Sequence, residues 1–99
     1  MPEQGIKVVF KVQARPGGAA DLKSLLLDLA AASRKESGCT DYQVLQNSAD
    51  AHEFVVIEAW SSDAALDAHM TTTHVQAALS KAPSLLAKGL ERGVYSAVV

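Results

Sequence analysis

The stretch His52-Glu-Phe-Val-Val-Ile-Glu-Ala-Trp60 decides the fold. Its centre is a run of β-branched and aromatic residues, which favours a strand. Side chains alternate along a strand, so Phe54, Val56, Glu58 and Trp60 share one face. The residues between them share the other face, and both faces are mostly apolar. We therefore expect a central strand that is covered on both sides.

The residues after this strand predict a helix over residues 62–70. Ser62 is a good N-cap residue. His69 lies about two turns into the helix, roughly 10 Å along its axis. That distance allows its side chain to return over the strand towards Glu58. The strand and this helix together hold the densest set of groups able to do chemistry in the sequence.

The remaining elements follow from hydrophobic periodicity and turn residues. In chain order we predict a strand over Ile6–Ala14, a helix from Ala19 to about Lys35, a strand over Thr40–Asn47, the central strand, the helix over 62–70, a helical segment over His74–Lys81, a helical turn over Ser84–Lys88 and a strand over Leu90–Val98. This β-α-β-β-α-β order predicts a single α+β domain over residues 1–99, with a ferredoxin-like, antiparallel four-stranded sheet and helices on one face.

The composition excludes several classes of protein. The chain has 99 residues, 48% of them hydrophobic, and a formal net charge of −2 without the basic stripe that nucleic acid requires. Cys39 is the single cysteine, so an internal disulfide is excluded. No apolar run is long enough to span a membrane, and the first residues lack the pattern of a signal peptide. We therefore expect a cytoplasmic protein that binds neither nucleic acid nor membrane.

One face of the predicted sheet has no helix to cover it. Val55, Ile57 and Ala59 would lie on that face, and this apolar set is costly to leave in water. Packing two sheets face to face removes the cost, which predicts a homodimer.

Residues spread over most of the chain resemble one known family. They are Glu36-Ser-Gly-Cys39, Tyr42, Phe54, Glu58-Ala-Trp60, Ala65-Leu66, Ala68-His69, Thr72 and His74. This pattern resembles the antibiotic biosynthesis monooxygenase (ABM) domain family, in particular its quinol monooxygenase-like branch, from Ile6 to about Val98. The resemblance implies a dimeric α+β barrel with a pocket between helices and sheet in each subunit. It also implies oxidation of quinols or polycyclic phenols by O2 without metal, flavin or haem.

Other branches of the family differ at defined positions. The haem-degrading members carry an Asn on the first strand, which this chain lacks. The polyketide-oxidising members have an Asn and a Tyr at positions that match Val56 and Leu66 here, while Trp60 is retained. By this resemblance, Val56 and Leu66 are candidate substrate-binding residues.

Glu58 and His69 are the candidate catalytic pair. A carboxyl group on a covered face is costly to ionise, and His69 is its expected partner. One interpretation is a base that removes a phenolic proton from the substrate. The alternative is a structural strut between strand and helix. Trp60 and Tyr42 are expected to bind an aromatic substrate, or else to be core residues.

The two histidines of the resembling pattern do not predict a metal site. His69 and His74 are five residues apart, not the three or four that align two side chains on one helix face. We therefore predict no metal, and place His74 at a helix start or a pocket mouth. Arg92 is expected to be an exposed charge, with anion or phenolate binding as the alternative.

Three functions are compatible with these residues. The first is a cofactor-independent monooxygenase that oxidises a small hydroquinone or phenolic substrate with O2. The second is an isomerase of a small metabolite, which would need cationic groups in the pocket. The third is a non-catalytic dimeric ligand-binding module, which a purely apolar pocket would favour.

Overall fold

The computed structural model describes residues 5–99, and the first four residues of the predicted 1–99 domain lie outside this range. The elements are β1 (Ile6–Gln13), α1 (Ala19–Ser33), β2 (Cys39–Asn47), β3 (Asp50–Trp60), α2 (Asp63–Met70), α3 (Thr73–Lys81), the 3-10 turn η1 (Ala82–Ser84) and β4 (Glu91–Ser96). The ferredoxin-like α+β prediction is confirmed.

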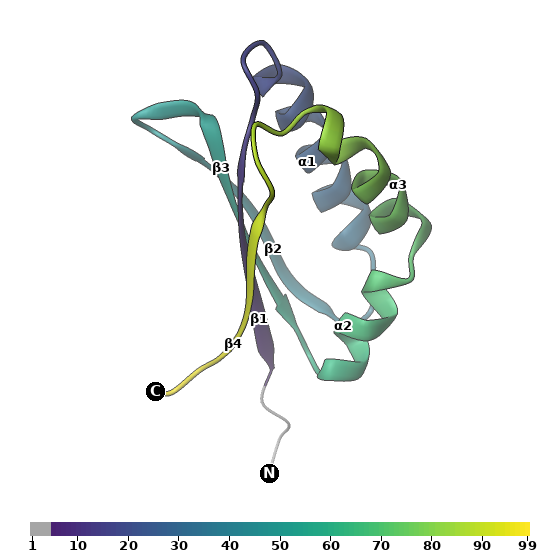
Figure 1. The fold of residues 1–99 in the computed structure, drawn as a ribbon. Coiled ribbons are helices and arrows are strands. Elements are labelled where there is room, and N and C mark those ends of the chain that lie inside the picture. The colour runs from purple at the N-terminus through teal and green to yellow at the C-terminus, as the bar shows by residue number, and fades with distance from the viewer. Residues whose placement is uncertain (1–4) are drawn as a thin grey trace.

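The four strands form one antiparallel sheet in the order β2-β3-β1-β4. The strand predicted as central, β3, pairs with both β1 and β2. In this register Val56 lies between Phe10 of β1 and Val44 of β2. The helices all lie on one side of the sheet, and the other side is open (Figure 1). One face of β3 therefore meets the helices, as its alternation requires.

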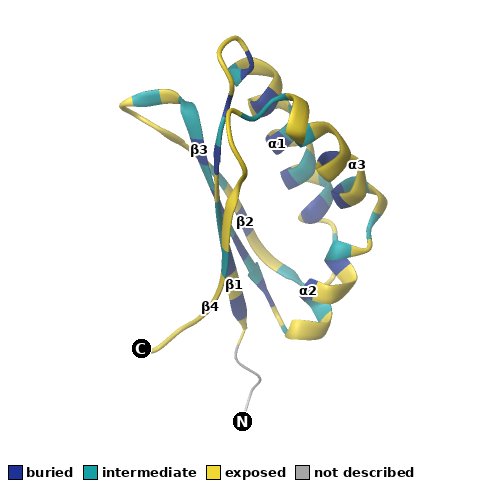
Figure 2. Cartoon of the chain, in the orientation of Figure 1, coloured by how far each residue is buried: buried dark blue, intermediate teal, exposed yellow. Residues whose placement is uncertain are grey.

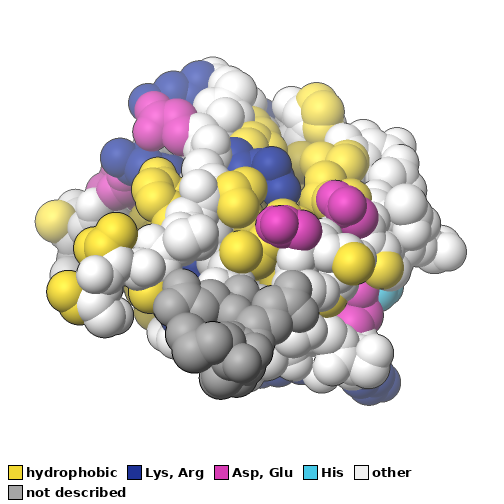
Figure 3. Space-filling model, turned by 90° about the horizontal axis from the view of Figure 1, so that it is seen from below, with side chains coloured by type: hydrophobic (Ala, Val, Ile, Leu, Met, Phe, Trp, Pro, Cys, Tyr) yellow, Lys and Arg dark blue, Asp and Glu magenta, His cyan; other side chains and the backbone are white. Residues whose placement is uncertain are grey.

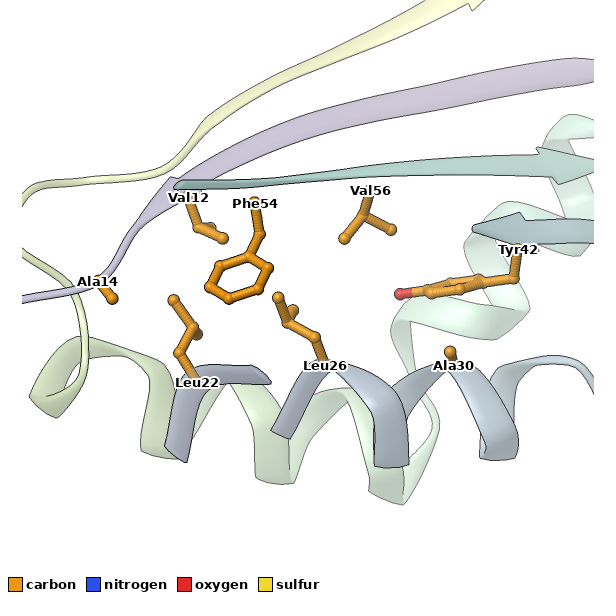
Figure 4. Packing of buried hydrophobic residues seen from close by; sticks show 8 residues of the cluster. All are labelled: Val12, Ala14, Leu22, Leu26, Ala30, Tyr42, Phe54 and Val56. Atoms are coloured by element: carbon orange, nitrogen blue, oxygen red, sulfur yellow. The ribbon is translucent and has the colours of Figure 1, made fainter. Parts of the chain in front are cut away.

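The main core fills the space between the sheet and α1. Phe54 and Val56 of β3 point towards Leu22 and Leu26 of α1 (Figure 4). These side chains are at most 4% exposed, and the buried residues follow the helix and strand faces that meet each other (Figure 2). A second, smaller cluster surrounds Trp60 at the other end of β3.

The segment after α3 differs from the prediction. A helical turn was expected over Ser84–Lys88, but Leu86 forms an isolated antiparallel bridge with Ala14. The backbone N–H of Arg15 donates to the Leu85 carbonyl at 2.9 Å. The prediction failed because pairing with the end of β1 outweighs local helix preference. The last strand is also shorter than predicted, since β4 ends at Ser96.

The connection from α1 to β2 also corrects the sequence interpretation. The helix ends at Ser33, about two residues earlier than predicted, and Arg34 is its C-cap residue. Gly38 is required for a close approach, because a Cβ at this position would collide with the side chain of Ala65 on α2. The missing side chain therefore lets α2 pack against the start of β2.

The open face of the sheet carries half-buried apolar side chains, including Val55, Ile57 and Ala59. The lower end of the molecule, which Figure 3 views from below, carries hydrophobic side chains interspersed with charged side chains of both signs. Within residues 5–99, no helix has the length and apolar character needed to cross a membrane.

Candidate functional site

Glu58 and Trp60 lie at the end of β3 on the face that meets the helices. Glu58 is 4% exposed and Trp60 is fully buried. The Trp60 indole Nε1–H donates a hydrogen bond to Oε1 of Glu58 at 2.9 Å. The strand's alternation places both side chains on one face, and this hydrogen bond holds the carboxyl group in a fixed orientation.

Helix α2 brings His69 over these two residues. The Ser62 hydroxyl accepts a hydrogen bond from the Ala65 backbone N–H at 3.1 Å and so caps the helix start. His69 is 3% exposed, and its ring lies 4.2 Å from the Trp60 ring, centroid to centroid. Its Nε2 is 3.6 Å from Oε1 of Glu58. The predicted pair is therefore close, although this separation exceeds a normal hydrogen bond.

The nearest polar partner of His69 is a residue to which the sequence interpretation assigned no role. Glu36, in the connection between α1 and β2, places Oε2 2.7 Å from His69 Nδ1. The same oxygen lies 2.8 Å from Nε2 of His74. Glu36 stands in the Glu36-Ser-Gly-Cys39 pattern of the resemblance, so that pattern was the available signal. The contact itself spans 33 residues and depends on tertiary packing.

Thr72 holds the two histidines in place. Its hydroxyl donates to the His69 carbonyl at 2.7 Å and accepts from the Val75 backbone N–H at 3.3 Å. Thr72 is thereby the N-cap of α3 and is tied to the end of α2. This is why two histidines on different helices reach one carboxylate.

A cavity of about 100 Å³ lies between the sheet and the helices. On this scale one water needs roughly 10–15 Å³, so the cavity has room for several waters or a small ring. Its polar lining is Tyr42, Glu58, His69 and Arg92. The apolar lining comes from Phe10, Val12, Leu22, Leu25, Leu26, Leu29, Met70, Val75, Ala78, Leu79, Ala82, Leu86 and Leu90.

Tyr42 is buried beside this cavity, at 1% exposure. Its hydroxyl makes no hydrogen bond of acceptable geometry to any residue from 5 to 99, and neither does the buried hydroxyl of Ser33, although Ser33 is near enough to oppose the rise in the pKa of Tyr42. Buried hydroxyl groups normally have partners. An unpartnered hydroxyl on a cavity wall is suited to a hydrogen bond with a bound ligand.

Burial shifts the pKa of the acidic groups around the cavity. It raises the pKa of Glu58 above its ordinary value, and the Trp60 hydrogen bond, His69 and Arg92 each oppose this rise. Burial also raises the pKa of Tyr42 strongly, and the charge of Glu58 adds to the effect. Burial raises the pKa of the Cys39 thiol too, which disfavours a reactive thiolate.

Glu36, His69 and His74 are the one group of side chains in residues 5–99 that could hold a metal ion, with ligand atoms within 4.8 Å of one another. The spacing argument against convergence of the two histidines was therefore wrong, because they lie on different helices. The contacts of 2.7 and 2.8 Å are hydrogen-bond distances. Ligands of tetrahedral zinc, each about 2.1 Å from the metal, lie roughly 3.4 Å apart. The geometry fits a hydrogen-bonded network better than a metal centre.

The cavity contains some of the predicted site residues and not others. Tyr42, Glu58 and His69 line it, as does Arg92. The predicted substrate-binding residues outside its lining are Trp60, His74, Val56 and Leu66. Trp60 lies behind Glu58 and His69 instead of on the wall. The alternation of side chains along β3 correctly predicted the face on which Trp60 lies. It could not predict that other side chains separate Trp60 from the cavity.

The sequence matches one family model and several known proteins. Residues 5–81 match the model described as antibiotic biosynthesis monooxygenase. The chain is 35% identical over 69 residues to a Mycobacterium tuberculosis protein named "Putative monooxygenase Rv0793", covering 70% of this chain and 67% of that protein. It is 28% identical over 80 residues to "Putative monooxygenase YcnE" of Bacillus subtilis, covering 81% and 84% respectively.

Solved structures of similar proteins have the same fold. The crystal structure of PA3566 from Pseudomonas aeruginosa gives a TM-score of 0.93 at 30% identity, covering 100% of this chain and 99% of that one. The structure of Rv0793 gives a TM-score of 0.91 at 25% identity, covering 96% of each chain. Fold and sequence together define the class: this chain belongs to the antibiotic biosynthesis monooxygenase family.

Proposed function

We propose that this protein is a monooxygenase that oxidises a small, single-ring hydroquinone or related phenol with O2 and needs no cofactor. Membership of the monooxygenase family supports the reaction type. The observation that carries the proposal is the cavity, in which an apolar wall meets the unpartnered Tyr42 hydroxyl, Glu58 and His69. A ring with one or two hydroxyl groups matches that division between apolar and polar lining.

The proposed reaction balances without an added reductant. One hydroquinone and one O2 yield one hydroxylated quinone and one water. One oxygen atom enters the ring and the other leaves as water, and the hydroquinone supplies all the electrons that reduce O2. Loss of a phenolic proton makes the ring electron-rich enough to react with O2 directly, which is the step that a base assists.

Each polar residue has a proposed role in this reaction. The pair of Glu58 and His69 accepts the phenolic proton, and the Tyr42 hydroxyl donates a hydrogen bond to the resulting oxyanion. Arg92 lies at the exposed side of the cavity, where its positive charge favours the same anion. The apolar residues exclude water, which strengthens these interactions and protects the reactive anion from side reactions.

We also propose that the protein works as a homodimer whose open sheet faces pack together. The support is the half-buried apolar set Val55, Ile57 and Ala59, opposite the face that the helices cover. The dimer would cover this face without closing the cavity, since the cavity lies on the helix side of the sheet.

A non-catalytic ligand-binding module is the second candidate. The predominance of apolar side chains in the cavity favours it. It predicts that a hydroquinone binds without any increase in its oxidation rate. The isomerase alternative has less support, because Arg92 is the only cationic residue among the described residues that line the cavity.

The test is consumption of O2 in the presence of methylhydroquinone, corrected for spontaneous oxidation. The parent protein should consume O2 well above that background. His69→Ala should lower the rate by about 10²-fold or more if the pair supplies the base, and Glu58→Gln separates charge from shape. Binding of methylhydroquinone with no added O2 uptake would favour the binding module instead.

A further inference from the structure

The hydrogen bonds of Glu36 distinguish the two members of the catalytic pair. Oε2 of Glu36 lies 2.7 Å from Nδ1 of His69, and a carboxylate can only accept hydrogen bonds. The Nδ1 of a neutral His69 must therefore carry the proton. Its Nε2 then has a free lone pair, on the side of the ring that faces Glu58.

Glu58 has a different set of contacts. Its Oε1 accepts the Trp60 indole hydrogen bond at 2.9 Å, and its side chain is 4% exposed. A buried carboxyl group with one neutral donor favours its uncharged form. The Oε1 atom of Glu58 is thus already engaged by the indole, whereas Nε2 of His69 makes no hydrogen bond to any of residues 5–99.

We propose that His69 is the base of the cavity and that Glu36 is its positioning residue, holding the tautomer whose Nε2 accepts the substrate's proton. This assignment rests on the proposed function, since it names the base for that reaction. When Nε2 takes the phenolic proton, the ring becomes an imidazolium between two carboxyl groups. Glu36, at 2.7 Å, stabilises this cation through a charge-assisted hydrogen bond.

His74 completes the arrangement from the surface. Its Nε2–H donates to the same Glu36 oxygen at 2.8 Å, and its side chain is 27% exposed. Together with the N-cap contacts of Thr72, this second hydrogen bond keeps the carboxylate directed at His69. Glu36 thus links the buried imidazole to a residue that solvent can reach.

The test combines nitrogen NMR of the histidine rings with kinetics. In the parent protein, the neutral ring of His69 should be the Nδ1–H tautomer. Glu36→Gln should shift that tautomer equilibrium and lower kcat for methylhydroquinone by about 10-fold to 10²-fold. Glu36→Asp should restore part of the rate, and Asp28→Asn, on the exposed side of α1, makes the same change in net charge as a control.

The NMR measurement separates this proposal from the proposed function. An Nε2–H tautomer in the parent protein would overturn the positioning role, whatever the activity. Unchanged kinetics in Glu36→Gln, while His69→Ala is impaired, would overturn it and leave the monooxygenase proposal intact. If neither the parent nor any variant oxidises the quinol, the monooxygenase proposal fails. The tautomer of His69 in Glu36→Gln then still decides whether Glu36 fixes the position of the proton on that ring.

Discussion

The indole of Trp60 donates a hydrogen bond to Glu58, two residues earlier on the same strand face, and its ring also packs on His69. One fully buried side chain therefore orients both members of the proposed catalytic pair. Trp60→Phe keeps an aromatic ring but removes the Nε1–H. We expect a loss of at least about 2 kcal/mol in unfolding free energy, from the lost hydrogen bond and the smaller ring. Urea unfolding measures it, and a loss below about 0.5 kcal/mol would mean that this contact stabilises little.

Glu58→Gln should change the pH dependence of stability. Burial raises the pKa of Glu58 above 4.5 in the folded protein. A raised folded pKa contributes stability that is fully present below the unfolded pKa and is lost as pH rises through the folded value. Glutamine does not titrate, so the variant does not lose this contribution as the pH rises. The unfolding free energy of the variant, minus that of the parent, should therefore increase from pH 4.5 to pH 8. Urea unfolding at several pH values measures this difference.

Glu53 on the same strand provides the control of opposite sign. Hydrogen bonds from Lys11 and Asn47 lower the pKa of Glu53. A lowered folded pKa contributes stability that is present above the unfolded pKa and is lost as pH falls through the folded value. Glu53→Gln should therefore be most destabilising at neutral pH and least below pH 4. The same pH trend in both variants would contradict the assignment for Glu58.

Gly38→Ala should push α2 away from the start of β2. The new methyl group would overlap the side chain of Ala65, and such overpacking costs about 1–3 kcal/mol. Ala65→Gly opens the same space from the other side. In a double-mutant cycle by urea unfolding, the second change should recover part of the loss despite the usual cost of glycine in a helix. Simple additivity would show that the two positions do not compete for space.

The proposed dimer predicts a specific effect of charge on the open sheet face. Ile57→Asp places a carboxylate in the centre of that face and should convert the dimer to a monomer at micromolar concentration. Sedimentation velocity measures the change. Ala31→Asp, on the exposed side of α1, is the matched control and should leave the mass unchanged. A parent protein that sediments as a monomer would contradict the dimer.

The fold could be predicted because its signals are local. Alternation in β3 identifies the face that carries Phe54, Val56, Glu58 and Trp60, and this face is buried under the helices. The failures occurred where a distant contact outweighs local preference. Leu86 forms a bridge with Ala14, at the end of β1, in place of the predicted helical turn.

The candidate site was predictable in part for the same reason. Strand parity and helix length were sufficient to bring His69 close to Glu58. They could not identify Glu36 as the closer partner, because its position depends on how the connection after α1 folds back. They could not place Trp60 behind the pair either, because depth within a layer is a property of three-dimensional packing.

Oxygen-isotope labelling tests the monooxygenase proposal most directly. The parent protein turns over methylhydroquinone under ¹⁸O₂. The reaction is quenched, and the mass of the product is measured by mass spectrometry before its oxygen exchanges with water. A monooxygenase places one heavy oxygen atom in each hydroxylated quinone and releases no hydrogen peroxide. Unlabelled methylbenzoquinone without an added hydroxyl group, formed with an equal amount of hydrogen peroxide and at the rate of the His69→Ala variant, would contradict a monooxygenase site in this cavity.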